Sequence, residues 1–241
     1  MTYKLKISYD GSFFRGYAKQ KDENLITVQS ELEKYLSLFF NTKISTFGSG
    51  RTDKYVHAID QTVSFKCDSD YDPKSIQNFL NSKLTNIYVN SIEKVPNSFH
   101  ARFSIKSKTY MYVINTGEFD VFKQRYEYQY NKSIDIKKCE DIINLFIGTK
   151  DFLSFSTSKL ENTTRTIRWI RIIKKNKKIY IFINGEGFLR NMVRMIVGII
   201  LTYCENKITY QEVLDLFKNP KKGSAVIKVP GCGLYLYRTI Y

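Results

Sequence analysis

Alternation of apolar and polar residues marks several short segments of this chain as half-buried strands. The segments cover residues 3–9, 61–67, 86–92 and 108–115, and then residues 166–173, 178–183 and 233–240. Successive side chains of a strand point to opposite faces, so each segment would bury one face and expose the other. The pattern is typical of antiparallel sheets.

Apolar residues recur at helical spacing between these segments. Thr27 is a suitable N-cap for the first helix, whose apolar stripe includes Leu32 and Leu36. Further helices are expected after Asp72, after Asp135 and over residues 188–203, and a capping box at residues 209–212 begins a last one.

The order of these elements predicts an α+β fold, with helices packed on a mostly antiparallel sheet. Each half of the chain combines strands and helices, so a duplicated architecture is plausible, although no direct sequence repeat accompanies it. We expect the halves to be residues 1–104 and 105–241, with a hinge near residues 104–107.

Composition indicates a basic globular protein. The 241 residues are 43% hydrophobic and carry 38 Lys and Arg against 23 Asp and Glu, a formal net charge of +15. Such a surplus favours a polyanionic partner, with nucleic acid as the first candidate. A Lys-rich coding bias would produce the same surplus without any such partner.

Several classes of protein are disfavoured by the sequence. The first residues contain no apolar signal-peptide core, and the apolar run 195–201 is too short to cross a bilayer, so we expect a cytoplasmic protein with no membrane partner. The four cysteines and two histidines are scattered and form no CxxC pair. We therefore expect no metal site, and reduced thiols.

Residues 48–58 place a single carboxylate, Asp53, among glycines and cations. Gly48 and Gly50 permit a tight turn, and Arg51 would favour the ionised form of Asp53. Catalytic residues often lie on loops of this kind at a sheet edge. An Asp that hydrogen-bonds its own turn is the alternative interpretation of this loop taken alone.

Two further segments carry candidate chemistry. Basic and aromatic residues interleave over residues 99–112, where Tyr110 could stack on an exposed base; an ordinary half-buried strand with a basic outer face is the alternative. Arg190 falls in the first turn of the predicted helix 188–203, on one face with Arg194. Such an Arg could pair with a carboxylate or hold a phosphate, unless both are simply solvated.

Taken in order, these segments resemble the tRNA pseudouridine synthase A family. The resemblance spans the chain and is carried by short motifs: YDGS at residues 9–12, the first helix at 27–33, the GxGRTDxGVHA loop at 48–58, FHARFSAKxRxYxY at 99–112, DFxxF at 151–155, GFLRxMVR at 187–194 and GLYL at 233–236. One match would be weak, but the ordered set is highly specific.

The resemblance implies a function and a set of roles. Family members isomerise uridine to pseudouridine at positions 38, 39 and 40 of the tRNA anticodon arm, act as homodimers and use no cofactor. The resemblance also implies a fold of two similar α/β halves around a continuous sheet with a central cleft. By position, Asp53 would be the nucleophile and Arg190 the partner that keeps it ionised. Tyr110 would stack on the target base, Arg51 would hold that base out of its stack, and Leu234 would form an apolar wall.

Two departures from the family pattern bear on these expectations. Tyr55 stands where the family has Gly, and Tyr17-Ala18 replaces Trp-Gln. Tyr55 suggests a relaxed or shifted target as one alternative. A non-catalytic RNA-binding protein or tRNA chaperone on the same fold is another, although such a protein would have no reason to keep Asp53, Tyr110 and Arg190 together.

Overall fold

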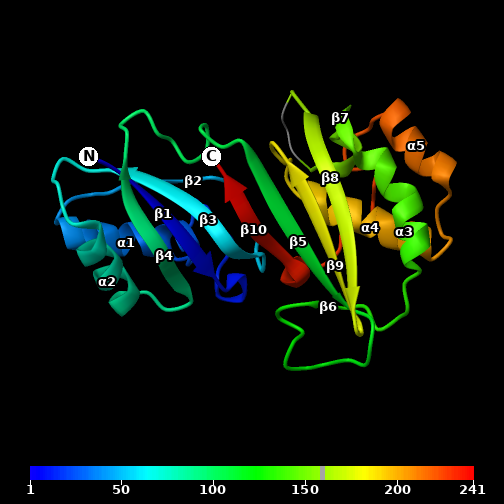
Figure 1. Ribbon diagram of the computed structural model, residues 1–241, viewed down its shortest axis with the longest axis horizontal. Coiled ribbons are helices and arrows are strands. Elements are labelled where there is room, and N and C mark those ends of the chain that lie inside the picture. The colour runs from blue at the N-terminus through cyan, green and yellow to red at the C-terminus, as the bar shows by residue number, and fades with distance from the viewer. Residues whose placement is uncertain (158–160) are drawn as a thin grey trace. The chain divides into compact units, whose positions relative to one another are not determined.

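The computed structural model describes residues 1–157 and 161–241, which form two compact units (Figure 1). The first unit comprises residues 1–106 and 235–241, and the second comprises residues 107–234. The sequence predicts this division two residues earlier and assigns the last strand to the second half. In the structure this strand pairs with β3, so the chain returns to the first unit. Both units combine helices with a mostly antiparallel sheet, which is the predicted α+β class.

The first unit is built on the strand order β4-β1-β3-β10. β1 (Thr2–Tyr9) runs antiparallel to β3 (His57–Lys66) and to β4 (Ile87–Val95), and β2 (Thr46–Gly48) runs antiparallel to β3. β10 (Leu234–Ile240) is parallel to β3. The predicted alternation matches the buried and exposed faces of β1, whereas β3 is buried on both faces over residues 61–65.

Two helices complete the first unit, and both begin at the residues that the sequence predicted. Thr27 caps α1 (Val28–Phe40) in a capping box with Ser30, and Asp72 caps α2 (Pro73–Lys83). Aromatic rings join α1 to the sheet and to α2, since Phe40 packs on Phe65 of β3 at 5.6 Å and Phe39 packs on Phe79 of α2 at 5.1 Å between ring centroids. The core of the unit contains fully buried side chains from both helices and the sheet, among them Leu32, Leu36, Ile76, Leu80 and Phe65.

The second unit has the strand order β5-β9-β8-β7, in which all neighbours are antiparallel. The strands are β5 (Ser107–Asn115), β7 (Gly148–Asp151), β8 (Thr164–Lys175) and β9 (Lys178–Gly185), with the short β6 (Tyr128–Gln129) parallel to β5. The predicted strands at 108–115, 166–173 and 178–183 lie within them.

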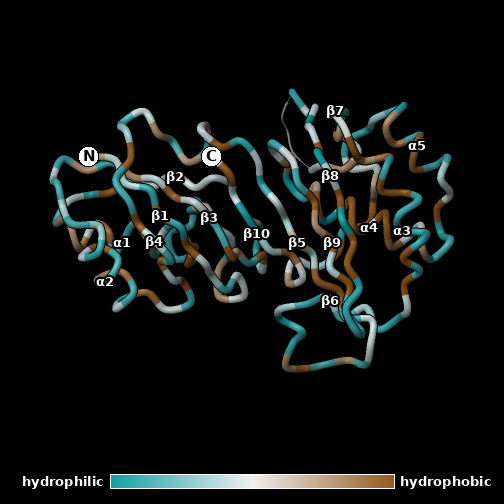
Figure 2. The backbone as a smooth tube through the Cα atoms, in the orientation of Figure 1, coloured by the Kyte–Doolittle hydropathy of each residue, from teal (hydrophilic) through white to brown (hydrophobic). Residues whose placement is uncertain are grey.

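The described residues of the second unit form three α-helices: α3 (Ile136–Ile143), α4 (Met192–Cys204) and α5 (Tyr210–Lys218). Asp135 caps α3, and the predicted capping box between Thr209 and Glu212 begins α5. α4 is buried over most of its length, and Figure 2 shows it largely in the brown of hydrophobic residues. A helix that is apolar all round belongs in a core. Among the described residues, no helix has the length and apolar character needed to cross a bilayer.

Candidate active site

The loop that carries Arg51 and Asp53 joins β2 to β3 and is anchored by the buried side chain of Gln61. Ser49 donates its hydroxyl to Gln61 Oε1 at 2.5 Å, and Gln61 Nε2 donates to the main-chain oxygen of Gly50 at 2.7 Å. Gln61 is fully buried on β3, on the same face as the apolar Val63 and Phe65. The amide therefore fixes the two residues that precede Arg51.

Thr52 is held at both its side chain and its main chain. Its hydroxyl lies 2.8 Å from the hydroxyl of Tyr9, and its carbonyl oxygen accepts the N–H of Tyr17 at 3.0 Å. Burial raises the pKa of Tyr9, so its phenol stays protonated and able to donate. Gly16 has a φ of +107°, and a Cβ there would lie 2.9 Å from the Thr52 oxygen. The close approach therefore requires glycine.

Asp53 begins the turn that leads into β3. Its main-chain oxygen accepts the N–H of Val56 at 3.2 Å, and its side chain is half-buried, whereas Arg51 is exposed. Tyr55, inside this turn, has a φ of 69°. The backbone thus takes the left-handed conformation that the family's glycine would adopt freely, and the tyrosine adopts it at a cost. Its ring is 45% exposed, with the Lys54 ammonium 4.4 Å from its centroid.

The end of the loop is tied to two distant parts of the chain by His57. Its buried Nδ1 accepts the N–H of Gly11 at 3.0 Å and lies 3.3 Å from a carboxylate oxygen of Asp10. Its ring stacks on Tyr235 of β10, with 4.7 Å between centroids. Tyr17, which replaces the family's Trp, is also buried, and its ring covers Gly48. The rings of Tyr17 and Tyr235 thus pack on Gly48 and His57, one at each end of the loop.

Tyr110 belongs to the second unit, on β5, where it lies opposite Ile183 of β9. Its ring packs on that of Phe188 in a T-shaped arrangement, with 5.1 Å between centroids and an interplanar angle of 83°. Only 7% of Tyr110 is exposed. This contact places the segment 187–190, which contains Arg190, beside the strand that carries Tyr110.

The prediction that Arg190 lies in the first turn of a helix is wrong. α4 begins at Met192, because Asn191 has a φ of 65° and interrupts the helical backbone before it. The main-chain oxygen of Arg190 accepts the N–H of Thr157 at 3.3 Å, and its side chain is exposed. Arg194, inside α4, instead donates to the carbonyl of Val229 at 2.8 Å. The two arginines therefore do not share a helix face, and Arg194 holds the chain segment that leads to Leu234.

Leu234 lies at the start of β10 and is buried. The short turn Gly231–Gly233 precedes it, and the Tyr112 hydroxyl donates to the carbonyl of Pro230 at 2.8 Å. A Cβ on Gly233 would lie 2.7 Å from the Val113 oxygen, so this turn packs directly on β5. Of the predicted site residues, Arg51 and Asp53 thus share one loop of the first unit. The second unit contains Tyr110, Arg190 and Leu234. Tyr110 lies on β5, and the segments that carry Arg190 and Leu234 pack on this strand.

Sequence reasoning missed Gln61 and Tyr9, which hold the Asp53 loop in place. A signal for Gln61 was present, because it lies on the strand face of Val63 and Phe65, which are fully buried. A polar side chain on such a face must find hydrogen-bond partners inside the protein. Tyr9 begins the YDGS motif, but nothing in the sequence indicates that its hydroxyl contacts Thr52.

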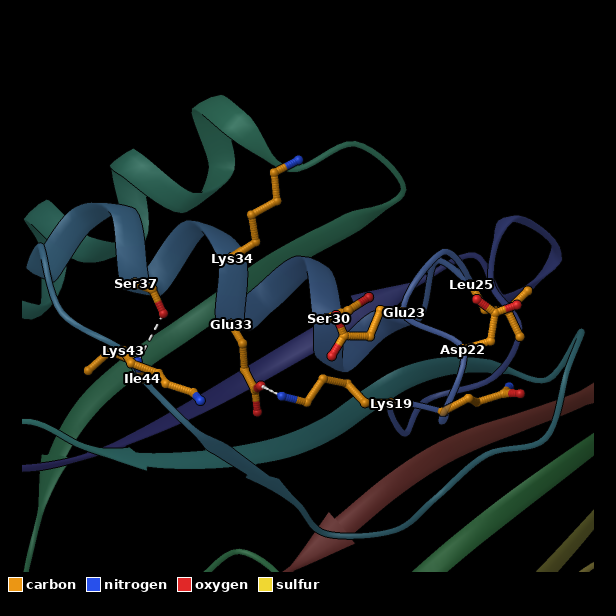
Figure 3. A pocket seen from close by; sticks show the side chains of 11 residues that line it. Lys19, Asp22, Glu23, Leu25, Ser30, Glu33, Lys34, Ser37, Lys43 and Ile44 are labelled. Atoms are coloured by element: carbon orange, nitrogen blue, oxygen red, sulfur yellow. Dashed lines mark hydrogen bonds and ion pairs between the residues drawn. The ribbon is translucent and has the colours of Figure 1, made fainter.

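A pocket of about 360 Å³ also lies in the first unit, between α1 and the segments 19–25 and 43–44 (Figure 3). In it Lys19 forms an ion pair with Glu33, whose other carboxylate oxygen accepts the N–H of Thr46 at 2.8 Å. Its lining includes three lysines and three carboxylates, so the pocket has no net charge that would favour an anionic or a cationic ligand. The Asp53 loop does not line this pocket. The Glu33 contacts join α1 to β2.

Comparison with known proteins agrees with the motifs. The family described as tRNA pseudouridine synthase matches residues 6–104 and 142–241. tRNA pseudouridine synthase A of Ureaplasma parvum serovar 3 is 45% identical over 244 residues, covering 100% of both chains. The enzyme of Mycoplasma genitalium is 42% identical over 98% of this chain and 96% of its own, and that of Clostridium acetobutylicum is 37% identical over 99% and 98%.

Among solved structures, the archaeal Nop10–Cbf5 complex overlaps with a TM-score of 0.38 at 9% identity, covering 96% of this chain and 59% of that one. That overlap is too low to add to the assignment. The family match and the full-length relatives, together with the anchored loop that bears the motif, show that this chain belongs to the tRNA pseudouridine synthase family, a family of isomerases.

Proposed function

We propose that this protein isomerises uridine to pseudouridine at positions 38, 39 and 40 of the tRNA anticodon arm, with Asp53 as the nucleophile. In this reaction the glycosidic N–C bond breaks, the base rotates, and a C–C bond forms. Substrate and product are isomers, so the reaction requires no redox cofactor. The carboxylate is the nucleophilic group that such chemistry needs. Membership of the family and the ordered motifs support the proposal.

The anchoring of the Asp53 loop is the observation that supports the nucleophile most directly. Gln61 fixes Ser49 and Gly50, and Tyr9 and Tyr17 fix Thr52, the residue next to Asp53. A nucleophile must be held close to its reacting geometry, and misplacement by about 1 Å can cost on the order of a hundredfold in rate. A surface turn with no reaction to perform would not need this many buried anchors.

Four other residues would act around Asp53. We assign Arg51, exposed on the same loop, to holding the target base out of its stack, which costs a few kcal/mol. Tyr110 would stack on that base, and Leu234 would line the pocket with an apolar wall. Arg190 would supply the positive charge that keeps Asp53 ionised.

The protein would act in the cytoplasm as a homodimer. Both features follow from the resemblance to the family, whose members act on tRNA. Light scattering of the purified protein tests the dimer, and a monomer at all concentrations would contradict it.

Release of tritium from tRNA labelled as [5-³H]uridine tests the reaction. The wild-type protein should release tritium, whereas Asp53→Ala and the isosteric Asp53→Asn should release none while binding tRNA as wild type does. Full turnover by either variant would overturn the nucleophile assignment. Tight tRNA binding without tritium release by the wild type would favour a non-catalytic RNA-binding protein instead.

Mapping of pseudouridines tests the target positions. Total tRNA from cells with and without this protein should differ at positions 38, 39 and 40. Differences confined to other positions would show that the chain belongs to the family but has a shifted target.

A further inference from the structure

Two cysteines that the reaction does not use meet between α3 and α4. Cys139 lies within α3, and Cys204 is the last residue of α4. Their Sγ atoms are 2.8 Å apart, although the residues are 65 positions apart in the sequence. A disulfide requires about 2.04 Å between sulfurs, so less than about 1 Å separates the pair from bonding distance. Helices α3 and α4 pack on each other in the second unit, as Figure 1 shows.

The two thiols differ in their access to solvent. Cys139 is 1% exposed, whereas Cys204 is partly exposed at the end of its helix. Cys204 is therefore the more accessible of the two cysteines to a small oxidant. This asymmetry gives the pair an attacking thiol at the surface and a second thiol directly behind it.

Hydrogen bonding also distinguishes the two sulfurs. The hydrogen bond between the two thiols lowers the pKa of Cys204, with a smaller contribution from the Lys138 ammonium, and outweighs the opposing effects of burial and of the Asp135 and Asp141 carboxylates. The same hydrogen bond, together with burial, raises the pKa of Cys139. Burial raises the pKa of Cys67 and of Cys232. The thiolate is the reactive form of cysteine, so Cys204 is the most reactive of the four.

We propose that Cys139 and Cys204 form a dithiol modification site that is oxidised by low-molecular-weight disulfides. The Cys204 thiolate attacks one sulfur of the small disulfide, forming a mixed disulfide and releasing the first small thiolate. Cys139 then loses its proton and attacks Cys204, which forms the Cys139–Cys204 bond and releases the second small thiolate. The two protein protons end on the two small thiols, and the protein loses the two electrons that the disulfide gains.

The bond would tie α3 to α4 without touching Asp53, which lies in the other unit. Because it closes a loop of 65 positions, it would restrict the unfolded chain. We expect oxidation to raise Tm by roughly 5–10 °C. This proposal does not depend on the proposed reaction, and its tests measure no turnover.

Oxidised glutathione is the probe. Treatment of the wild-type protein should remove two of its four free thiols and yield one crosslinked peptide pair that contains Cys139 and Cys204. The Cys67→Ser/Cys232→Ser double variant keeps the pair and should behave as wild type does. Four thiols left free, or a crosslink between other cysteines, would overturn the proposal.

Single variants separate the two roles. Cys139→Ser should keep one glutathione on Cys204, because no second thiol can displace it. Cys204→Ser should leave Cys139 unmodified, because its sulfur is buried. Modification of Cys139 in the absence of Cys204, or no stable adduct on Cys204 in the absence of Cys139, would contradict the assigned order of attack.

Discussion

The hydroxyl of Tyr9, the last residue of the inner strand β1, lies 2.8 Å from the hydroxyl of Thr52, so the end of this strand fixes the residue next to Asp53. Tyr9→Phe removes one partner and leaves the buried Thr52 hydroxyl unsatisfied. We expect a loss of about 1–2 kcal/mol in unfolding free energy and a fall in kcat of roughly tenfold, with KM little changed. Chemical denaturation and tritium release measure the two effects.

Tyr3→Phe is the matched control for this variant. Tyr3 is buried on the same strand, and its hydroxyl donates to the carbonyl of Tyr71 at 2.8 Å, away from the Asp53 loop. It should lose a similar amount of stability and keep the wild-type kcat. Equal losses of kcat in both variants would mean that Tyr9 acts only through global stability.

The Gln61 amide gives a second test of the anchored loop. Gln61→Met keeps the length of the side chain but removes the bonds to Ser49 and Gly50. We expect a loss of about 2–3 kcal/mol in unfolding free energy and a lower kcat. Asn81→Leu is the control, since Asn81 bridges both main-chain groups of Val89, remote from the loop. A Gln61→Met enzyme with the wild-type kcat would show that the loop needs no such anchor.

Most of the secondary structure could be predicted because its causes are local. Strand alternation and the caps at Thr27, Asp72, Asp135 and Thr209 depend on residues close together in the sequence, and the structure has helices beginning at each of them. The apolar pattern predicts a helix from residue 188, ahead of the observed start of α4, because Phe188 and Leu189 continue it. The left-handed backbone of Asn191 that stops the helix leaves no mark on that pattern.

The supports of the candidate site were not predictable for a different reason. Tyr9 and Thr52 are hydrogen-bonded although they lie 43 positions apart in the sequence, and Gly11 and His57 although they lie 46 positions apart. These pairings therefore depend on the register of β1 against β3. Asp53 itself stood out because it is a carboxylate among glycines and cations. Motifs thus identify residues that react, whereas the residues that hold them require the fold.

Acid should weaken the second unit through Glu205. Lys207, Tyr130 and Lys132 surround its carboxylate and lower its pKa from 4.5 to about 2. A carboxyl whose pKa is lower in the folded state stabilises the fold above its unfolded pKa, and loses that contribution as pH falls through the folded value. Unfolding free energy should therefore decrease between about pH 4.5 and about pH 2.

Glu205→Gln should be less stable than wild type at neutral pH and should lose less stability across this acid range. Urea denaturation at a series of pH values measures both. Glu186→Gln is the control, because the Glu186 carboxylate is 56% exposed and its pair with Arg168 should contribute little. An unchanged acid dependence in Glu205→Gln would contradict the assignment.

Tyr55 occupies a left-handed backbone position that costs an ordinary residue roughly 1–2 kcal/mol. Tyr55→Gly removes that cost but adds about 0.5–1 kcal/mol of unfolded-chain entropy, so we expect a net gain of roughly 0–1.5 kcal/mol. Tyr55→Ala keeps the backbone cost and loses the contact with the Lys54 ammonium, so it should be the less stable of the two.

The same two variants test whether Tyr55 selects the target uridine. Its ring is exposed beside Asp53, but the backbone of the turn already has the conformation that glycine would give it. We therefore expect both variants to modify the same tRNA positions as wild type, as read by pseudouridine mapping. A shift of the modified tRNA positions in both variants would show that the ring contributes to selectivity.

Stability of the same variants tests the backbone argument separately. An alanine variant more stable than the glycine variant would contradict that argument, because only glycine relieves the left-handed conformation.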